Sequence, residues 1–183
     1  MYKWIRQQAS WKKTALIFIT AQIIFLCMNT LTFPAIMKDG SGLIPFDMTG
    51  ISGYDYQYAD SFINELTLNG RTVYLFFQEP LDILYPLLIS FSFVMAFCLL
   101  SKEKSRWPLI GFIPMIFDYL ENILVISMLT VKPLPLFLPS VSSSITWLKA
   151  VSSMLCMGLL IIVSLWYFTG WIIQRRKQKY GNK

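Results

Sequence analysis

The stretch WPLIGFIPMIFDYLENILVISML, residues 107–129, decides the fold class of this chain. An apolar helix of about 20 residues crosses the hydrocarbon core of a bilayer, and this stretch is apolar except at its centre, Asp118-Tyr119-Leu120-Glu121-Asn122. A charged side chain in the middle of a spanning helix costs roughly 2.5–3.5 kcal/mol on insertion scales. Two carboxyl groups about one turn apart therefore predict a polar site inside a membrane domain.

The composition extends this interpretation to the whole chain. Of its 183 residues, 55% are hydrophobic and 14% are charged, against roughly 25% charged residues in a soluble domain. The hydrophobic residues form four blocks separated by polar or proline-containing segments, with Pro34 expected to end the first block and a loop over 130–144 before the fourth. We predict an all-α membrane protein, a single integral membrane domain over 1–183, with four transmembrane helices over approximately 14–33, 76–100, 107–129 and 146–173.

The positions of the basic residues predict the orientation. The N-terminus, the segment between the second and third blocks and the C-terminus carry twelve of the sixteen lysines and arginines. Because positive loops stay on the cytoplasmic side, both termini are expected in the cytoplasm, in the plasma or inner membrane of a cell. In a soluble protein the net charge of +6 would suggest nucleic acid, but charges beside apolar blocks indicate contact with membrane lipids instead.

Residues 54–69 are predicted to form an amphipathic helix on the extracytoplasmic side, between the first and second spans. Tyr58, Phe62 and Leu66 recur at helical spacing, Ser52 or Asp55 can cap its start, and Asn69-Gly70 can end it. Such a helix either covers the bundle as a lid or gates a site, with Tyr54, Tyr56 and Tyr58 near the mouth of that site.

Counting the rise of each helix brings polar residues of all four spans to a similar depth in the outer half of the membrane. Asn29 and Thr30 come from the first span, and Ser152 and Ser153 from the fourth. The predicted ligand-binding residues are Asp82 on the second span, Asp118, Glu121 and Asn122 on the third, and Lys149 on the fourth. We expect them to line an outward-facing polar pocket for a lipid-like or small amphipathic molecule.

Two other interpretations stay open. The chain can be an accessory subunit whose acids are protonated, or paired with Lys149 or Arg71, and only hold the helices together. It can also be an enzyme that uses Asp118 or Glu121 as a general acid or base on a lipid or isoprenoid. The sequence favours a non-enzyme and leaves a homo-oligomer or a membrane-protein partner possible.

Several chemistries have no support in the sequence. The chain contains no histidine, which removes the commonest general base and zinc ligand. Asp82, Asp118 and Glu121 offer oxygen ligands that would suit a hard cation, but no phosphate-binding motif accompanies them. We therefore expect no bound metal and no cofactor.

The central half of the chain also resembles a known group of proteins. The resemblance rests on Gly53-Tyr54, Asn69-Gly70-Arg71-Thr-Val-Tyr74, Pro80-Leu-Asp82-Ile-Leu-Tyr-Pro86 and Phe117-Asp118-Tyr-Leu-Glu121-Asn122. These segments resemble a group of small uncharacterised bacterial four-helix membrane proteins, which implies a bacterial plasma membrane and no known activity. Four helices with intramembrane acids are also similar in plan to sterol-isomerase-like EXPERA domains. The order and spacing of the acids do not match that family, so no functional residue is transferred from it.

Overall fold

The computed structural model describes residues 2–101 and 105–180, and every regular element in that part of the chain is helical. Four helical segments within it are long and apolar enough to cross a membrane, which confirms the predicted all-α, four-span architecture. The segments are Trp11–Asp39, Leu68–Leu100, Trp107–Thr130 and Leu138–Ile173.

Three of these spans are composed of shorter helices in direct succession. The first comprises α2 (Trp11–Cys27), the π-helical η1 (Met28–Thr32) and α3 (Phe33–Asp39). The second comprises α5 (Leu68–Val73), the π-helical η4 (Tyr74–Gln78) and α6 (Glu79–Leu100). The third comprises the 3₁₀ helix η5 (Trp107–Phe112) and α7 (Ile113–Thr130), and the fourth is a single helix, α8 (Leu138–Tyr180).

The prediction that Pro34 ends the first helix is wrong, because a π-helical turn precedes it. Proline lacks the N–H of the helical ladder and clashes with the carbonyl four residues earlier. In η1 the Phe33 N–H donates to the Met28 carbonyl, five residues back, and the wider turn lets the helix continue through Pro34 to Asp39. The same arrangement precedes Pro80, and the two π turns are joined where Thr32 Oγ1 hydrogen-bonds Gln78 Oε1.

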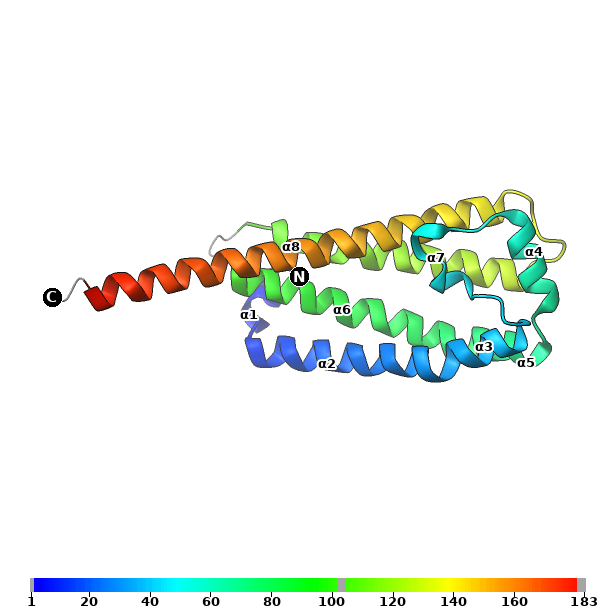
Figure 1. The fold of residues 1–183 in the computed structure, drawn as a ribbon, viewed down its shortest axis with the longest axis horizontal. Coiled ribbons are helices and arrows are strands. Elements are labelled where there is room, and N and C mark those ends of the chain that lie inside the picture. Colours follow the sequence, from blue (N-terminus) through cyan, green and yellow to red (C-terminus); the bar gives the residue numbers. More distant parts are fainter. Residues whose placement is uncertain (1, 102–104, 181–183) are drawn as a thin grey trace.

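The four spans lie side by side, as Figure 1 shows, and the chain termini lie toward the same end of the bundle. The short helix α1 (Tyr2–Gln8) packs against α6 at this end through the buried Ile5. At the opposite end, which we call the loop end, lie the connections over 40–67 and 131–137. Helix α8 packs along α7 and then extends past the other helices at the end of the bundle where the chain termini lie.

The connection before α8 is shorter than predicted. A loop was expected over 130–144, but α8 already begins at Leu138. Pro139 is compatible with this start because the first turn of a helix needs no intrahelical donor, and the Leu138 N–H bonds the Pro135 carbonyl. The early start adds about two turns to α8 at the loop end, and these turns carry Ser142.

The predicted amphipathic helix over 54–69 is two helices in the structure. Helix α4 (Tyr56–Glu65) is capped by Asp55, whose carboxylate accepts from the Tyr58 N–H, and it buries Ala59, Phe62 and Ile63. At Leu66 the backbone is extended, and Thr67 then caps α5 by accepting from the Gly70 N–H. Asn69-Gly70 therefore lies inside a helix instead of ending one, because Thr67 supplies a new N-cap.

The loop before α4 enters the bundle instead of lying over it. It contains the short 3₁₀ helices η2 (Phe46–Met48) and η3 (Gly50–Ser52). Phe46 is fully buried, and its ring packs against those of Tyr54, Phe62 and Tyr74. Because Phe46 is anchored among these rings, the next residue, Asp47, is held next to the polar residues of the helices.

Candidate functional site

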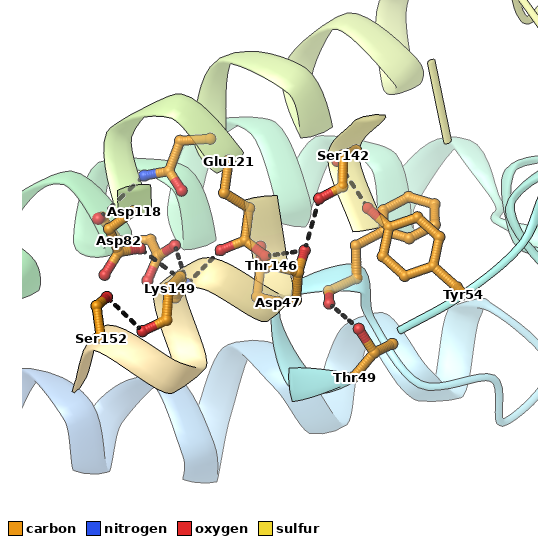
Figure 2. A network of polar contacts seen from close by, with 12 residues as sticks. Asp47, Thr49, Tyr54, Asp82, Asp118, Glu121, Ser142, Thr146, Lys149 and Ser152 are labelled. Carbon is orange, nitrogen blue, oxygen red and sulfur yellow. Dashed lines mark hydrogen bonds and ion pairs between the residues drawn. The ribbon is translucent and has the colours of Figure 1, made fainter. Parts of the chain in front are cut away.

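Lys149 on α8 lies between three carboxylates of the neighbouring helices, as Figure 2 shows. Its Nζ atom is 2.5 Å from Glu121 Oε2, 2.8 Å from Asp118 Oδ1 and 3.8 Å from Asp82 Oδ2. All three acidic residues are buried. We call Asp82, Asp118, Glu121 and Lys149 the carboxylate–lysine cluster, and it links α6, α7 and α8.

Helical spacing places these groups together. Asp118, Glu121 and Asn122 are three and four residues apart on α7, so they lie on one face of that helix. The Asn122 amide donates to the Asp82 carbonyl on α6 at 3.0 Å, which fixes the register of the two helices. The five residues predicted from the sequence, Asp82, Asp118, Glu121, Asn122 and Lys149, are thus brought together by the fold.

Glu121 is also bound from the side facing the loop end. Thr146, one turn before Lys149 on α8, has its Oγ1 2.5 Å from Glu121 Oε1 and 3.1 Å from the Ser142 carbonyl. Ser142 Oγ in turn accepts the Tyr54 hydroxyl at 2.7 Å. Polar contacts therefore continue from the loop residue Tyr54 through α8 to the carboxylate–lysine cluster (Figure 2).

Tyr54 is suited to donate a hydrogen bond in this series. Burial raises the pKa of its hydroxyl above the usual range, and the nearby Glu121 and Asp47 carboxylates raise it further. The phenol therefore stays protonated at neutral pH. Its backbone N–H is held as well, because it donates to Ser143 Oγ at 2.9 Å.

Asp47 adds a carboxyl group from the loop, which no sequence pattern indicated. Its Oδ2 accepts the Tyr74 hydroxyl at 2.9 Å, and its Oδ1 is buried without a hydrogen bond. Burial raises the pKa of Asp47 well above its usual range, and the Asp82 and Glu121 carboxylates raise it further, against smaller opposing effects of Lys149 and Tyr74. One oxygen each of Asp47, Asp82 and Glu121 lie within 4.8 Å of one another.

Glu79 adds a fifth acid to Asp47, Asp82, Asp118 and Glu121. It is only 2% exposed, and neither of its carboxylate oxygens has a hydrogen-bond partner. It lies three residues before Asp82 on α6 and within electrostatic range of Asp47, Asp82, Glu121 and Lys149. Five buried or partly buried acids thus surround one lysine.

Some residues expected at the site lie elsewhere. The Asn29 and Thr30 side chains bond carbonyls of their own helix, at Phe25 and Leu26, and the first span reaches the polar interior through Thr32 instead. Ser152 likewise donates to the Lys149 carbonyl of its own helix. A serine, threonine or asparagine side chain can donate to a backbone carbonyl about one turn earlier in its own helix. This local hydrogen bond competes with any contact to another helix of the bundle.

Arg71 is not a counterion of the cluster. Its guanidinium donates to the carbonyls of Leu129, near the end of α7, and Ile63 on α4. These carbonyls have no intrahelical partner of their own because they fall in the last turns of their helices. Arg71 therefore fastens α4 and α7 to α5, and Lys149 is the cation of the cluster.

Some of the additional residues had a usable signal in the sequence. Ser142 and Thr146 precede Lys149 by seven and three residues, and Glu79 precedes Asp82 by three, so each shares a helix face with a predicted site residue. The helix-face signal of Ser142 could not be used, because a loop is predicted over 130–144. Asp47 had no signal, because its position depends on the path of a loop.

A groove at the loop end lies next to Tyr54. It encloses about 350 Å³ and is lined by hydroxyls and apolar side chains of the loop and of α8, namely Ile51, Ser52, Gly53, Ser143, Ser144, Trp147 and Leu148. Gly53 and Ser143 are direct neighbours in the chain of Tyr54 and Ser142, which begin the series of polar contacts to Glu121.

The arrangement can hold and exchange protons, bind a donor-rich group, or fix the helices. Comparison of the chain with protein-family models, with curated proteins and with solved structures gave no match. The chemistry of the carboxylate–lysine cluster and the loop above it therefore carries the functional argument.

Proposed function

We propose that this chain is a multi-pass membrane protein that binds a small amphipathic or lipid-like molecule at the loop end. The polar head of the molecule lies at the carboxylate–lysine cluster, and its apolar part lies along the groove at Trp147. The observation that carries the proposal is that polar contacts to Glu121, through Thr146 and Ser142, begin at Tyr54, beside the groove residue Gly53 in the chain.

The composition of the groove supports such a ligand. Trp147 and Ile51 are 47% and 56% exposed, whereas Ser52, Ser143 and Ser144 supply hydroxyls in the same lining. Binding sites for small molecules combine apolar walls with a few placed polar groups. Ionisable residues inside a membrane domain mark binding or transport sites more often than they serve packing alone.

The orientation follows from charge. We propose that both termini lie in the cytoplasm and that the loop end, with α4, faces the extracytoplasmic side of a plasma or inner membrane. The support is the basic character of the N- and C-terminal segments, which lie toward one end of the bundle (Figure 1), together with the positive-inside rule. We propose a bacterial membrane, as the resemblance given for the central half of the sequence implies.

A structural role is the second candidate, and a specific contact favours it. Lys149 bridges acids of α6 and α7, and Asn122 joins the same two helices. Polar contacts between membrane helices contribute roughly 0.6–2 kcal/mol each. In this case the cluster would only fasten the bundle, as expected of an accessory subunit.

Native mass spectrometry after purification in detergent distinguishes the two candidates. The chain is compared with Asp82→Asn, Glu121→Gln and Trp147→Ala. Asp60→Asn is the matched control, because the Asp60 carboxylate accepts from Asn64 of its own helix, α4. For the proposed function we expect a lipid-like adduct on the parent and the control, and its loss from the other three.

Trp147→Ala keeps the test decisive because this exposed side chain contributes little to the core. Loss of the adduct from Trp147→Ala, with the thermal midpoint unchanged, supports the groove. A parent that carries no adduct even after incubation with a total lipid extract, combined with a lowered midpoint in Glu121→Gln, overturns the proposal in favour of the structural role.

A further inference from the structure

The buried polar atoms at the loop end are unequal in kind. Among the buried side-chain atoms here without a hydrogen-bond or ion-pair partner, Asp47 Oδ1, both oxygens of Glu79 and Asn122 Oδ1 are acceptors, whereas Gln78 Nε2 is a donor. A buried polar group without a partner costs roughly 1–3 kcal/mol and more when it is charged. The region is therefore short of hydrogen-bond donors.

The charges show the same imbalance. Five carboxyl groups lie in this region, and Lys149 is the cation that pairs with three of them. The five belong to Asp47, Glu79, Asp82, Asp118 and Glu121. Lys149 balances one of the five, so four negative charges remain when all are ionised. Buried charges require protons or a bound cation.

From this imbalance we infer that the head group of the bound molecule is cationic, and that an ammonium group binds where the loop acid Asp47 meets Asp82 and Glu121. The inference rests on the proposed function and specifies the chemical class of the ligand. It also assigns a binding role to Asp47, on a loop, in addition to the residues of the helices.

The spacing of the three oxygens fits an ammonium group. Three atoms that all lie within 4.8 Å of one another share a point at most about 2.8 Å from each of them, by plane geometry, and charged N–H···O hydrogen bonds are about 2.7–2.9 Å long. Calcium requires about 2.3–2.6 Å and magnesium about 2.0–2.1 Å, so the same oxygens suit a metal ion where they lie closer together than this limit, and the calcium arm of the test below separates the two cases. Lys149 shows the same chemistry next to this point, since its ammonium is held by three carboxylates.

Glu79 is the independent observation that points to a ligand. The residue is only 2% exposed, and neither carboxylate oxygen has a hydrogen-bond partner. Among the charged groups near Glu79, Asp47 has the largest electrostatic effect on it. A buried acid in this position is unfavourable beside the Asp47 carboxyl and becomes more favourable when a cation binds nearby. The buried, unpartnered Glu79 carboxyl is therefore consistent with a positively charged occupant.

The test uses amphiphiles with the same twelve-carbon chain and different heads, added to the full chain in neutral detergent micelles. Dodecylamine, dodecanol and dodecyl phosphate are titrated, with calcium chloride alone as a separate arm, and binding is read from the shift in thermal unfolding midpoint and from native mass spectrometry. We expect dodecylamine to bind at least tenfold more tightly than the other two. Asp47→Asn and Asp82→Asn should each lose at least tenfold, and Asp60→Asn should not.

The remaining outcomes are decisive. Dodecanol could bind as tightly as dodecylamine, with binding lost in Trp147→Ala and retained in Asp47→Asn. This result overturns the cationic head group and leaves the proposed function standing. Stabilisation by calcium alone that is lost in Asp47→Asn replaces the ammonium with a metal ion and overturns the inference. Failure of all three amphiphiles to bind overturns both proposals.

Discussion

Lys149 and Glu121 form the shortest ion pair of the bundle interior, with Nζ 2.5 Å from Oε2. Glu121 is fully buried, and its second oxygen is bound by Thr146. The pair joins α7 to α8 at the depth where α6 contributes Asp82. Its two partners lie 28 residues apart in the chain, so their contact reports on the assembled bundle.

Replacement of Lys149 with methionine leaves three buried carboxylates without their cation. Removal of one partner from a buried ion pair destabilises a protein by about 3–5 kcal/mol, so we expect a large fall in the thermal midpoint in detergent. Lys149→Met combined with Glu121→Gln should recover part of the loss. Lys38→Met is the control, since Lys38 is exposed. A Lys149→Met chain as stable as the parent would show that the acids are neutral without the lysine.

Asp47 predicts a specific dependence of stability on pH. Its pKa is raised well above the usual range by burial and by Asp82 and Glu121, whereas the unfolded carboxyl ionises near pH 4. Above pH 4 the unfolded chain has lost this proton and the folded chain retains it, so the stability that Asp47 contributes falls as the pH rises toward the folded-state pKa. Below pH 4 the contribution is complete.

Asp47→Asn tests this dependence because asparagine cannot ionise. The free energy of unfolding of the variant, measured without added ligand, should fall less steeply from pH 4 to neutral pH than that of the parent. The comparison isolates Asp47 from the other groups around it, which are Tyr74, Glu79, Asp82, Glu121 and Lys149. Parallel curves for the two chains would contradict the prediction.

Gly53 holds the loop against α8. Its φ is +65°, and a Cβ there would lie 2.7 Å from Ser143 Oγ, the acceptor of the Tyr54 N–H. Gly53→Ala should push the loop from α8 and speed amide hydrogen exchange at residues 50–55. Gly42→Ala is a matched control, because Gly42 also has a positive φ, +83°, but no atom lies within 4 Å of its added Cβ. Equal amide hydrogen exchange in the two variants would show that the positive φ accounts for the effect and that the contact with Ser143 does not contribute.

Gly111 allows the start of the third span to approach α6. A Cβ at this position would lie 2.9 Å from Val94 Cγ2 and 3.1 Å from the Val94 backbone nitrogen. Overpacking of this kind costs typically about 1–3 kcal/mol, so Gly111→Ala should lower the thermal midpoint. Gly158→Ala, with open space around the added Cβ, should leave it unchanged or slightly raised. A Gly111→Ala chain with the parent's midpoint would contradict this close packing.

Hydrophobic periodicity, block length and helical spacing determined much of this protein from the sequence alone. Four apolar blocks were enough to predict four spans, because a helix is the means by which a single chain satisfies its backbone in lipid. The spacing of Asp118, Glu121 and Asn122 placed them on one face, since residues three and four apart on a helix are neighbours. These are local properties, and local properties can be read without knowledge of the fold.

The tertiary structure decided what depends on contacts between distant residues. The π turns before Pro34 and Pro80 meet through Thr32 and Gln78, a contact across 46 residues that no local pattern contains. Asp47 reaches the acids because Phe46 is packed among rings from other segments. The Asn29 and Thr30 side chains bond their own helix, because a position along a helix does not specify which way the side chain points. The meeting of Asp82, Asp118 and Glu121 with Lys149 was predictable, whereas the addition of Asp47 to these acids appeared only once the loop was in place.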